Sequence, residues 1–140
     1  RSADSARFDV FGLIDAALNS EAAHTLRTLE GLRGEGVETP VILWALAREL
    51  RQLAGIAQQY SQGVPLEKAF ASARPPVWDK RRPLVSRALQ RHPASRWNQL
   101  LSDAQRIDAQ IKGQAAGDPW IGLAHLALSL AGQRLPIPAA

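Results

Sequence analysis

The stretch TPVILWALARELRQLAGIAQQY, residues 39–60, carries the strongest helical pattern in the chain. Its opening pair Thr39-Pro40 predicts where a helix begins, because proline is favoured in the first helical turn after a capping residue. Apolar or aromatic residues then recur every three or four positions, at Leu43, Leu46, Leu50, Leu53, Ala57 and Tyr60. Such spacing places them on one face of a helix. The stripe is shorter than the roughly three or four heptads of a free coiled coil, so we expect this helix to pack inside a bundle.

Similar apolar stripes cover the rest of the chain, and no segment shows the period-two alternation of a strand. They predict further helices at residues 8–18, 20–33, 64–73, 79–91, 95–111 and from 119 onward. Glycine or proline separates most of these segments, as expected at helix ends. The sequence therefore predicts an all-α fold, a compact bundle of about six or seven helices that forms a single domain over residues 1–140.

Short polar residues mark several of the expected helix starts. Ser20 and Ser95 are expected to be N-caps, and Asp118-Pro119 repeats the signal of Thr39-Pro40. The helix that follows Asp118 is apolar on nearly every face. We expect such a helix to lie at the centre of the bundle or to be covered by a partner.

The composition excludes several classes of protein. The 140 residues include no cysteine, which excludes disulfides and thiolate metal sites and favours a cytoplasmic location. No apolar run reaches the roughly 18–20 residues of a membrane span, and no signal peptide is visible. Methionine is absent too, so we expect the chain to be a fragment of a longer protein.

No pattern of residues predicts a catalytic, metal or cofactor site. His24, His92 and His125 are far apart and lack metal-ligand spacing. Gly31, Gly34 and Gly36 follow a predicted helix without the lysine of a phosphate-binding loop. No serine has the neighbouring base that a nucleophile needs. We therefore expect no enzyme activity, no metal and no cofactor in this domain.

Positive charge is concentrated in one segment. The net charge is +4, yet residues 74–96 alone carry seven basic residues against Asp79, a local charge of +6. A local basic field is typical of a site for an anionic partner such as nucleic acid. The alternative is a solvated helix face that is rich in arginine.

Within this basic segment, Trp78 is the strongest functional candidate. It follows Pro75-Pro76 and precedes Lys80, Arg81 and Arg82. An exposed aromatic ring beside cations suits a stacked nucleobase and its phosphate, so these four residues are candidate DNA contacts. The alternative is that Trp78 packs into the bundle as a hydrophobic staple before the helix.

The other aromatic residues fit positions on helical stripes. We assign them to packing in the core or in an interface: Trp44, Trp97, Trp120, Phe8, Phe11 and Tyr60.

Four motifs in a fixed order resemble those of a known family. They are Arg7-Phe8-Asp9-Val10-Phe11, Val77-Trp78-Asp79-Lys80-Arg81-Arg82, Asp108-Ala109-Gln110-Ile111-Lys112-Gly113 and Pro119-Trp120. Their order and spacing resemble the C-terminal domain of the delta subunits of bacterial DNA polymerase III, over about residues 7–132. Delta belongs to the clamp loader, which places the sliding clamp on primed DNA in replication.

The resemblance implies an all-helical collar domain whose work is oligomerisation. In that family the collar joins delta to delta-prime and to the ATPase gamma and tau subunits in a pentameric loader. Two AAA+-like N-terminal domains are expected to be missing here, and the first of them provides the clamp contact. The resemblance also implies DNA binding near Trp78 and a subunit interface on the last helix, with Trp120, Leu123, Leu126 and Leu130 as candidates. Polymerase activity would belong to the parent holoenzyme, a DNA-directed DNA polymerase.

Two other interpretations stay open at this point. A stand-alone helical module that binds nucleic acid would need most of the seven cations of residues 74–96 on one exposed face. A helical enzyme domain would need a pocket lined by paired acids or histidines, for which the sequence offers no candidate.

Overall fold

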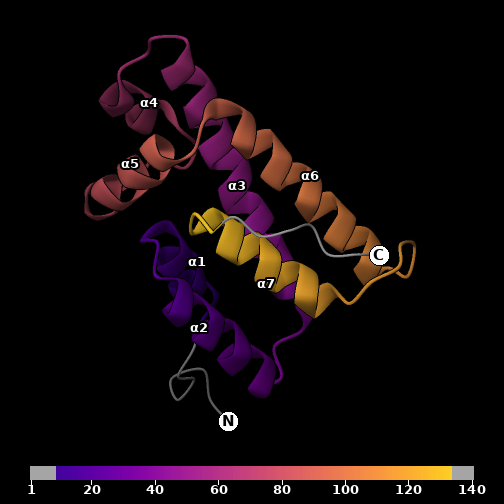
Figure 1. Ribbon diagram of the computed structural model, residues 1–140. Coiled ribbons are helices and arrows are strands. Elements are labelled where there is room, and N and C mark those ends of the chain that lie inside the picture. The colour runs from indigo at the N-terminus through magenta and orange to yellow at the C-terminus, as the bar shows by residue number, and fades with distance from the viewer. Residues whose placement is uncertain (1–8, 134–140) are drawn as a thin grey trace.

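A computed structural model describes residues 9–133 and confirms the all-α prediction. Seven α-helices and one short 3₁₀ helix make up this part of the chain (Figure 1). They are α1 (Val10–Leu18), α2 (Ala22–Gly34), α3 (Thr39–Ser61), α4 (Leu66–Ser72), η2 (Asp79–Arg81), α5 (Arg82–Arg91), α6 (Ala94–Ile111) and α7 (Pro119–Leu130). Phe8, which the sequence assigns to packing, lies outside the described residues.

Helix α3 is the axis of the bundle, as its apolar stripe predicts. It packs most extensively against α6 and also contacts α1, α4, α5 and α7. The five apolar positions from Leu43 to Ala57 are buried. Tyr60 is 44% exposed at the end of the helix, so it is not a core residue, and the interface part of its assignment stays a prediction. The stripe therefore organises the bundle up to the last turn of α3.

Helix α7 packs against α6, α2 and α1 within the chain. Leu123, Leu126 and Leu130 are buried by these neighbours, at 0–1% exposure. The prediction that these leucines face another subunit is wrong, because the chain's own helices already cover them. A Cβ atom on Gly122 would lie 2.8 Å from Cγ1 of Ile107, so the close crossing of α6 and α7 requires a glycine there.

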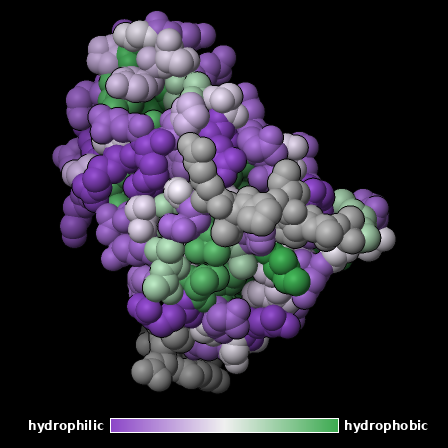
Figure 2. Space-filling view, in the orientation of Figure 1, coloured by the Kyte–Doolittle hydropathy of each residue, from purple (hydrophilic) through white to green (hydrophobic). Residues whose placement is uncertain are grey.

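The opposite side of α7 is not enclosed by the described residues. Ile121 is 52% exposed, and Ala124 and Leu128 on the same face are half-buried. Trp120 is also half-buried, with the Arg33 guanidinium 5.0 Å from its ring centroid. Figure 2 shows apolar residues gathered on this side of the molecule, over the position of α7 in Figure 1. We refer to Trp120, Ile121, Ala124 and Leu128 as the α7 outer face.

Three of the four predicted capping residues have other roles. Thr39 is the first residue of α3, whose N-cap position is Glu38. Ser20 has a positive φ of 62° between α1 and α2, and its hydroxyl donates to the carbonyl of Ala131 at 2.6 Å. Ser95 lies inside the first turn of α6, because the helix begins at Ala94 directly after Pro93. Asp118 is a cap as predicted, since its carboxylate accepts from the Trp120 backbone N–H at 2.9 Å.

The carboxyl ends of α1 and α7 meet at the end of α5. Arg91 donates to the Leu18 carbonyl at 3.1 Å, and Nε2 of His92 lies 2.8 Å from the Leu130 carbonyl. The His92 ring also meets Trp97 edge to face, with 5.2 Å between ring centroids. Burial lowers the pKa of His92, the Leu130 hydrogen bond opposes that change, and nearby Arg91 adds to it. His92 is therefore held neutral as a hydrogen-bond donor in the core.

Candidate nucleic-acid interface

The segment that precedes η2 is fixed to the bundle by its backbone. Gln52 of α3 donates its side-chain N–H to the Pro75 carbonyl at 2.6 Å. The backbone N–H of Val77 donates to the Phe70 carbonyl at 3.2 Å, and the Val77 side chain is 5% exposed. Residues 75–77 therefore lie against α3 and α4, which sets the direction of the next side chain.

Trp78 points away from the bundle. Its backbone is extended, and consecutive side chains of an extended chain point to opposite sides. Because Val77 points inward, the Trp78 ring points outward and is 74% exposed. The Trp78 carbonyl accepts from the backbone N–H groups of Arg81 and Arg82 at 2.9 and 3.1 Å. The staple alternative is therefore wrong: the backbone of Trp78 starts η2 and α5, while its ring stays in solvent.

Arg81 is held inside an ion-pair network and does not face solvent freely. Its guanidinium lies 3.1 Å from the Asp15 carboxylate of α1 and 3.2 Å from the Glu49 carboxylate of α3. Burial alone would lower the pKa of Arg81, but the two carboxylates outweigh burial and raise the pKa above its ordinary value. This cation links three elements of the bundle.

Arg82 is also engaged within the chain. It contacts the Glu67 carboxylate at 2.6 Å, donates to the Val77 carbonyl at 3.1 Å and lies 5.8 Å from the centroid of the Phe70 ring. Lys80, by contrast, is exposed and lines a shallow hollow beside α1. Of the four candidate DNA contacts, only Trp78 and Lys80 are thus exposed without an ion pair in the described part of the chain.

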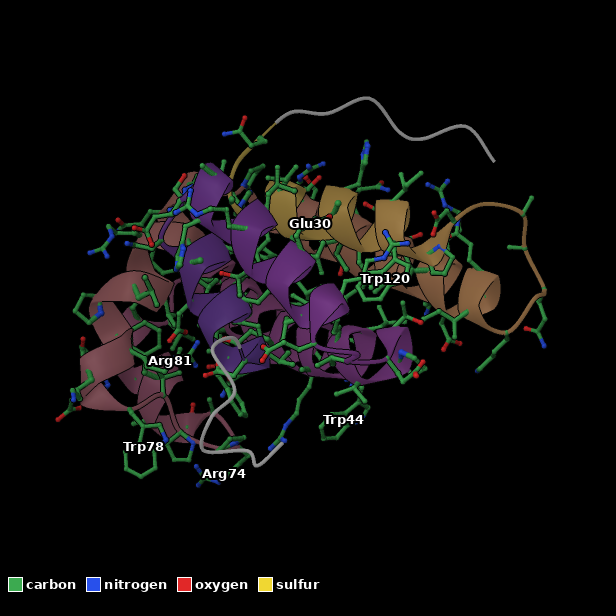
Figure 3. The ribbon with its side chains drawn as sticks, turned by 90° about the horizontal axis from the view of Figure 1, so that it is seen from below. Glu30, Trp44, Arg74, Trp78, Arg81 and Trp120 are labelled. Carbon is green, nitrogen blue, oxygen red and sulfur yellow. The ribbon has the colours of Figure 1, made fainter. Side chains whose placement is uncertain are left out.

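Trp78 lines a groove of about 750 Å³ between α1, α3 and residues 74–81. Three exposed aromatic rings line it: Phe11 at 76%, Trp44 at 62% and Trp78 at 74% exposure. Arginines also line it, namely Arg48, Arg51, Arg74 and Arg81. Figure 3 shows Trp78, Arg74 and Trp44 along one edge of the molecule. We refer to this site, with these rings and arginines, as the aromatic groove.

The aromatic groove corrects part of the assignment of aromatic residues to packing. Phe11 and Trp44 are not core residues, whereas Trp97 is buried at 1% exposure as expected. Trp44 lies one position outside the buried stripe of α3, on the exposed face with Val41, Arg48 and Arg51. That spacing of three, four and three residues is the signal that could have separated Trp44 from the core.

The seven cations of residues 74–96 do not share one face. Arg81 and Arg82 are ion-paired, Arg91 bonds to helix-end carbonyls, and Arg96 lines a separate groove between α6 and α7. The arrangement that a stand-alone module would need is therefore not met. Two arginines outside the basic segment, Arg48 and Arg51, instead join Arg74 in the aromatic groove.

The described residues form neither a metal site nor a membrane-spanning helix. Residues 9–133 contain no group of histidine and acidic residues that is able to hold a metal ion. Within the same range, no helix has both the length and the apolar character needed to cross a membrane.

Two comparisons with known proteins indicate the same family. Residues 10–137 match the family described as "Processivity clamp loader gamma complex DNA pol III C-term". A DNA polymerase III subunit delta of Escherichia coli (strain K12) is 32% identical over 127 residues, which cover 91% of this chain and 36% of that protein. The protein of the same name from Haemophilus influenzae is 30% identical over 132 residues, covering 90% and 38%. The chain thus spans little more than a third of the length of these relatives.

Proposed function

Since the chain belongs to the family of clamp-loader C-terminal domains of DNA polymerase III delta subunits, we propose that it is a collar domain. Its function is to join delta to the delta-prime and ATPase subunits of a loader in cytoplasmic DNA replication. In this proposal the domain itself carries no ATPase or polymerase site. Contact with the sliding clamp belongs to the other domains of the delta subunit.

The observation that carries the assembly function is the α7 outer face. This face is not part of the core of the bundle, because the leucines on the other side of α7 already fill the core and are fully buried. Ile121 nevertheless remains 52% exposed beside half-buried Ala124 and Leu128. An apolar face that residues 9–133 do not cover is typical of a protein–protein interface. The α7 outer face replaces the interface first expected at Leu123, Leu126 and Leu130. Of the four residues predicted for that interface, Trp120 is retained.

A direct test is the association of the chain with the delta-prime and ATPase subunits. Ile121→Arg places a charge on the α7 outer face without touching the buried side of the helix. Tyr60→Arg is the matched control, because Tyr60 is similarly exposed but lies at the end of α3. We expect Ile121→Arg to prevent assembly and Tyr60→Arg to leave it intact. Equal assembly by both variants would exclude the α7 outer face as the interface.

The second part of the proposal is a contact between Trp78 and the primer–template end. Its support is the 74% exposure of the Trp78 ring on a segment whose backbone is fixed by Gln52 and Phe70. A rigidly placed, exposed ring is suited to stack on a terminal base. Lys80 is the remaining candidate cation beside it, because Arg81 and Arg82 are paired within the chain.

A stand-alone module for nucleic acid is the alternative function. It predicts that the chain alone binds primed DNA as tightly as the assembled loader does. The collar function predicts instead that tight binding to primed DNA requires the other subunits. A comparison of the two affinities at one salt concentration separates these outcomes, since phosphate contacts depend strongly on salt.

A further inference from the structure

We propose that Phe11 and Trp44 form a second stacking platform, so that the aromatic groove binds a short segment of single-stranded DNA. The inference rests on the proposed contact of Trp78 with primed DNA, because Trp78 lines the same groove.

The first argument is the exposure of the three rings. Phe11, Trp44 and Trp78 come from α1, α3 and the segment before η2, yet all three line one groove and are more than 60% exposed. Separate elements thus bring unburied aromatic rings together, although each ring gains little stability from this position. Rings arranged in this way match proteins that bind single strands, where successive bases stack on aromatic side chains regardless of sequence.

The second argument is the charge of the groove. Asp15 and Glu49 line it, but Arg81 pairs with both carboxylates at 3.1 and 3.2 Å. This neutralises much of the negative charge that would repel a phosphate. Four arginines and two carboxylates leave the lining with a net charge of +2. Such a field attracts the backbone of a nucleic acid.

The remaining arginines are positioned to contact phosphates. Arg48 lies 5.6 Å from the centroid of the Trp44 ring, a cation–π arrangement that holds its guanidinium beside the platform. Arg74 donates to the carbonyls of Ala71 and Ala73 at 3.2 and 3.0 Å, which fixes it next to Trp78. No ion pair engages Arg48, Arg51 or Arg74 within the described residues.

The third argument concerns the class of nucleic acid. Stacking on a protein ring requires a base face that is free of its neighbours, and in a duplex those faces are covered by stacked base pairs. A volume of about 750 Å³ is in the range of pockets for small ligands and is consistent with a few nucleotides. The groove therefore fits a single strand and not a duplex.

The test uses the chain itself, whose core is closed by its own helices. A labelled oligothymidine of about eight nucleotides is titrated against the chain, and binding is followed by fluorescence anisotropy and by quenching of tryptophan emission. Phe11→Ala and Trp44→Ala are compared with Tyr60→Ala, which removes an exposed ring of α3 outside the groove. Arg51→Ala is compared with Arg106→Ala, since Arg106 lines a different groove. Circular dichroism checks that every variant is folded.

We expect saturable binding that quenches tryptophan emission and weakens as salt is raised. Phe11→Ala and Trp44→Ala should each weaken binding about fivefold or more, while Tyr60→Ala leaves it unchanged. The proposal is overturned if binding is unsaturable, if the two groove variants bind like the wild type, or if a blunt duplex binds as well as the single strand. An acidic peptide that binds more tightly than the oligonucleotide would also overturn it, in favour of a protein segment as occupant.

The same variants separate this inference from the proposed function. The Phe11→Ala and Trp44→Ala chains should still assemble with the other subunits. The assembled loader should still bind a duplex end that has no single-stranded overhang. They should lose the additional affinity that a single-stranded overhang provides. If assembly fails for the wild type but the groove binds oligothymidine, the collar proposal alone is wrong.

Discussion

The guanidinium of Arg81 lies 3.2 Å from the carboxylate of Glu49, a residue of α3 that is only 12% exposed at its side chain. The local sequence favours a different role for Arg81, because its neighbours Trp78 and Lys80 suggest a nucleic-acid contact. The ion pair instead joins η2 to α3, and a second contact to Asp15 adds α1. Arg81 thus has a structural role and also lines the aromatic groove.

Arg81→Ala should lower the free energy of unfolding by about 1–3 kcal/mol, because it leaves the half-buried Glu49 carboxylate without its partner. Urea unfolding measures the change. Lys80→Ala is the matched control, and its effect should stay within about 0.5 kcal/mol because Lys80 is exposed. Equal stability of the two variants would show that the Arg81 network contributes nothing measurable.

Trp78→Ala should change stability by no more than about 0.5 kcal/mol, since the ring lies in solvent. In the assembled loader it should weaken binding to primed DNA by about 1–3 kcal/mol, the contribution of one stacked base. Trp97→Ala is the contrasting variant, because Trp97 is buried, and it should cost about 3–5 kcal/mol of stability. A Trp78→Ala chain that unfolds would restore the packing role for Trp78.

His92 makes stability depend on pH below neutrality. Burial lowers its pKa in the folded chain, whereas the unfolded chain titrates at about 6.5. Above that pH both states are neutral at this residue, and stability from His92 is fully present. As the pH falls below about 6.5, the unfolded state takes up the proton first, so stability is lost.

The measurement is the difference in unfolding free energy between the wild type and His92→Gln from pH 8 down to about pH 5. The advantage of the wild type should be constant at the upper end and should shrink as the solution becomes acidic. A difference that does not change over this range would contradict a neutral, buried His92.

Gly122→Ala should lower stability by about 1–3 kcal/mol, because the added methyl group overpacks the crossing of α6 and α7 at Ile107. Gly55→Ala is the matched control in α3. Nothing lies within 4 Å of a Cβ atom there, so it should stabilise the chain by about 0.4–1 kcal/mol. Thermal unfolding of both variants measures whether Gly122→Ala lowers stability and Gly55→Ala raises it. Destabilisation by both would contradict the packing explanation.

The sequence predicts the helices well because their apolar stripes are local. The stripe of α3 and the start signal at Asp118 need only residues within two or three turns. The same patterns do not say which neighbour covers an apolar face. Leu123 was therefore expected at a subunit interface, although α6 and α1 belong to the same chain and help to bury α7.

The candidate site was predicted only where the local chain determines it. Trp78 follows a proline break, which marks a helix start but leaves open whether the ring is exposed. The partners of Arg81 are 66 and 32 residues away in sequence. Trp44 lies next to the buried position Leu43, and a simple count of apolar residues does not separate the two. Long-range pairing and the exact phase of a helix thus account for the differences between prediction and structure.

In the proposed function, this domain joins a clamp loader through the α7 outer face. Gel filtration with light scattering, on the chain mixed with the delta-prime and ATPase subunits, tests it most directly. We expect one complex that contains the chain, that persists with Tyr60→Arg, and that is lost with Ile121→Arg. A chain that stays separate from the other subunits, or a complex that Ile121→Arg leaves intact, would contradict it.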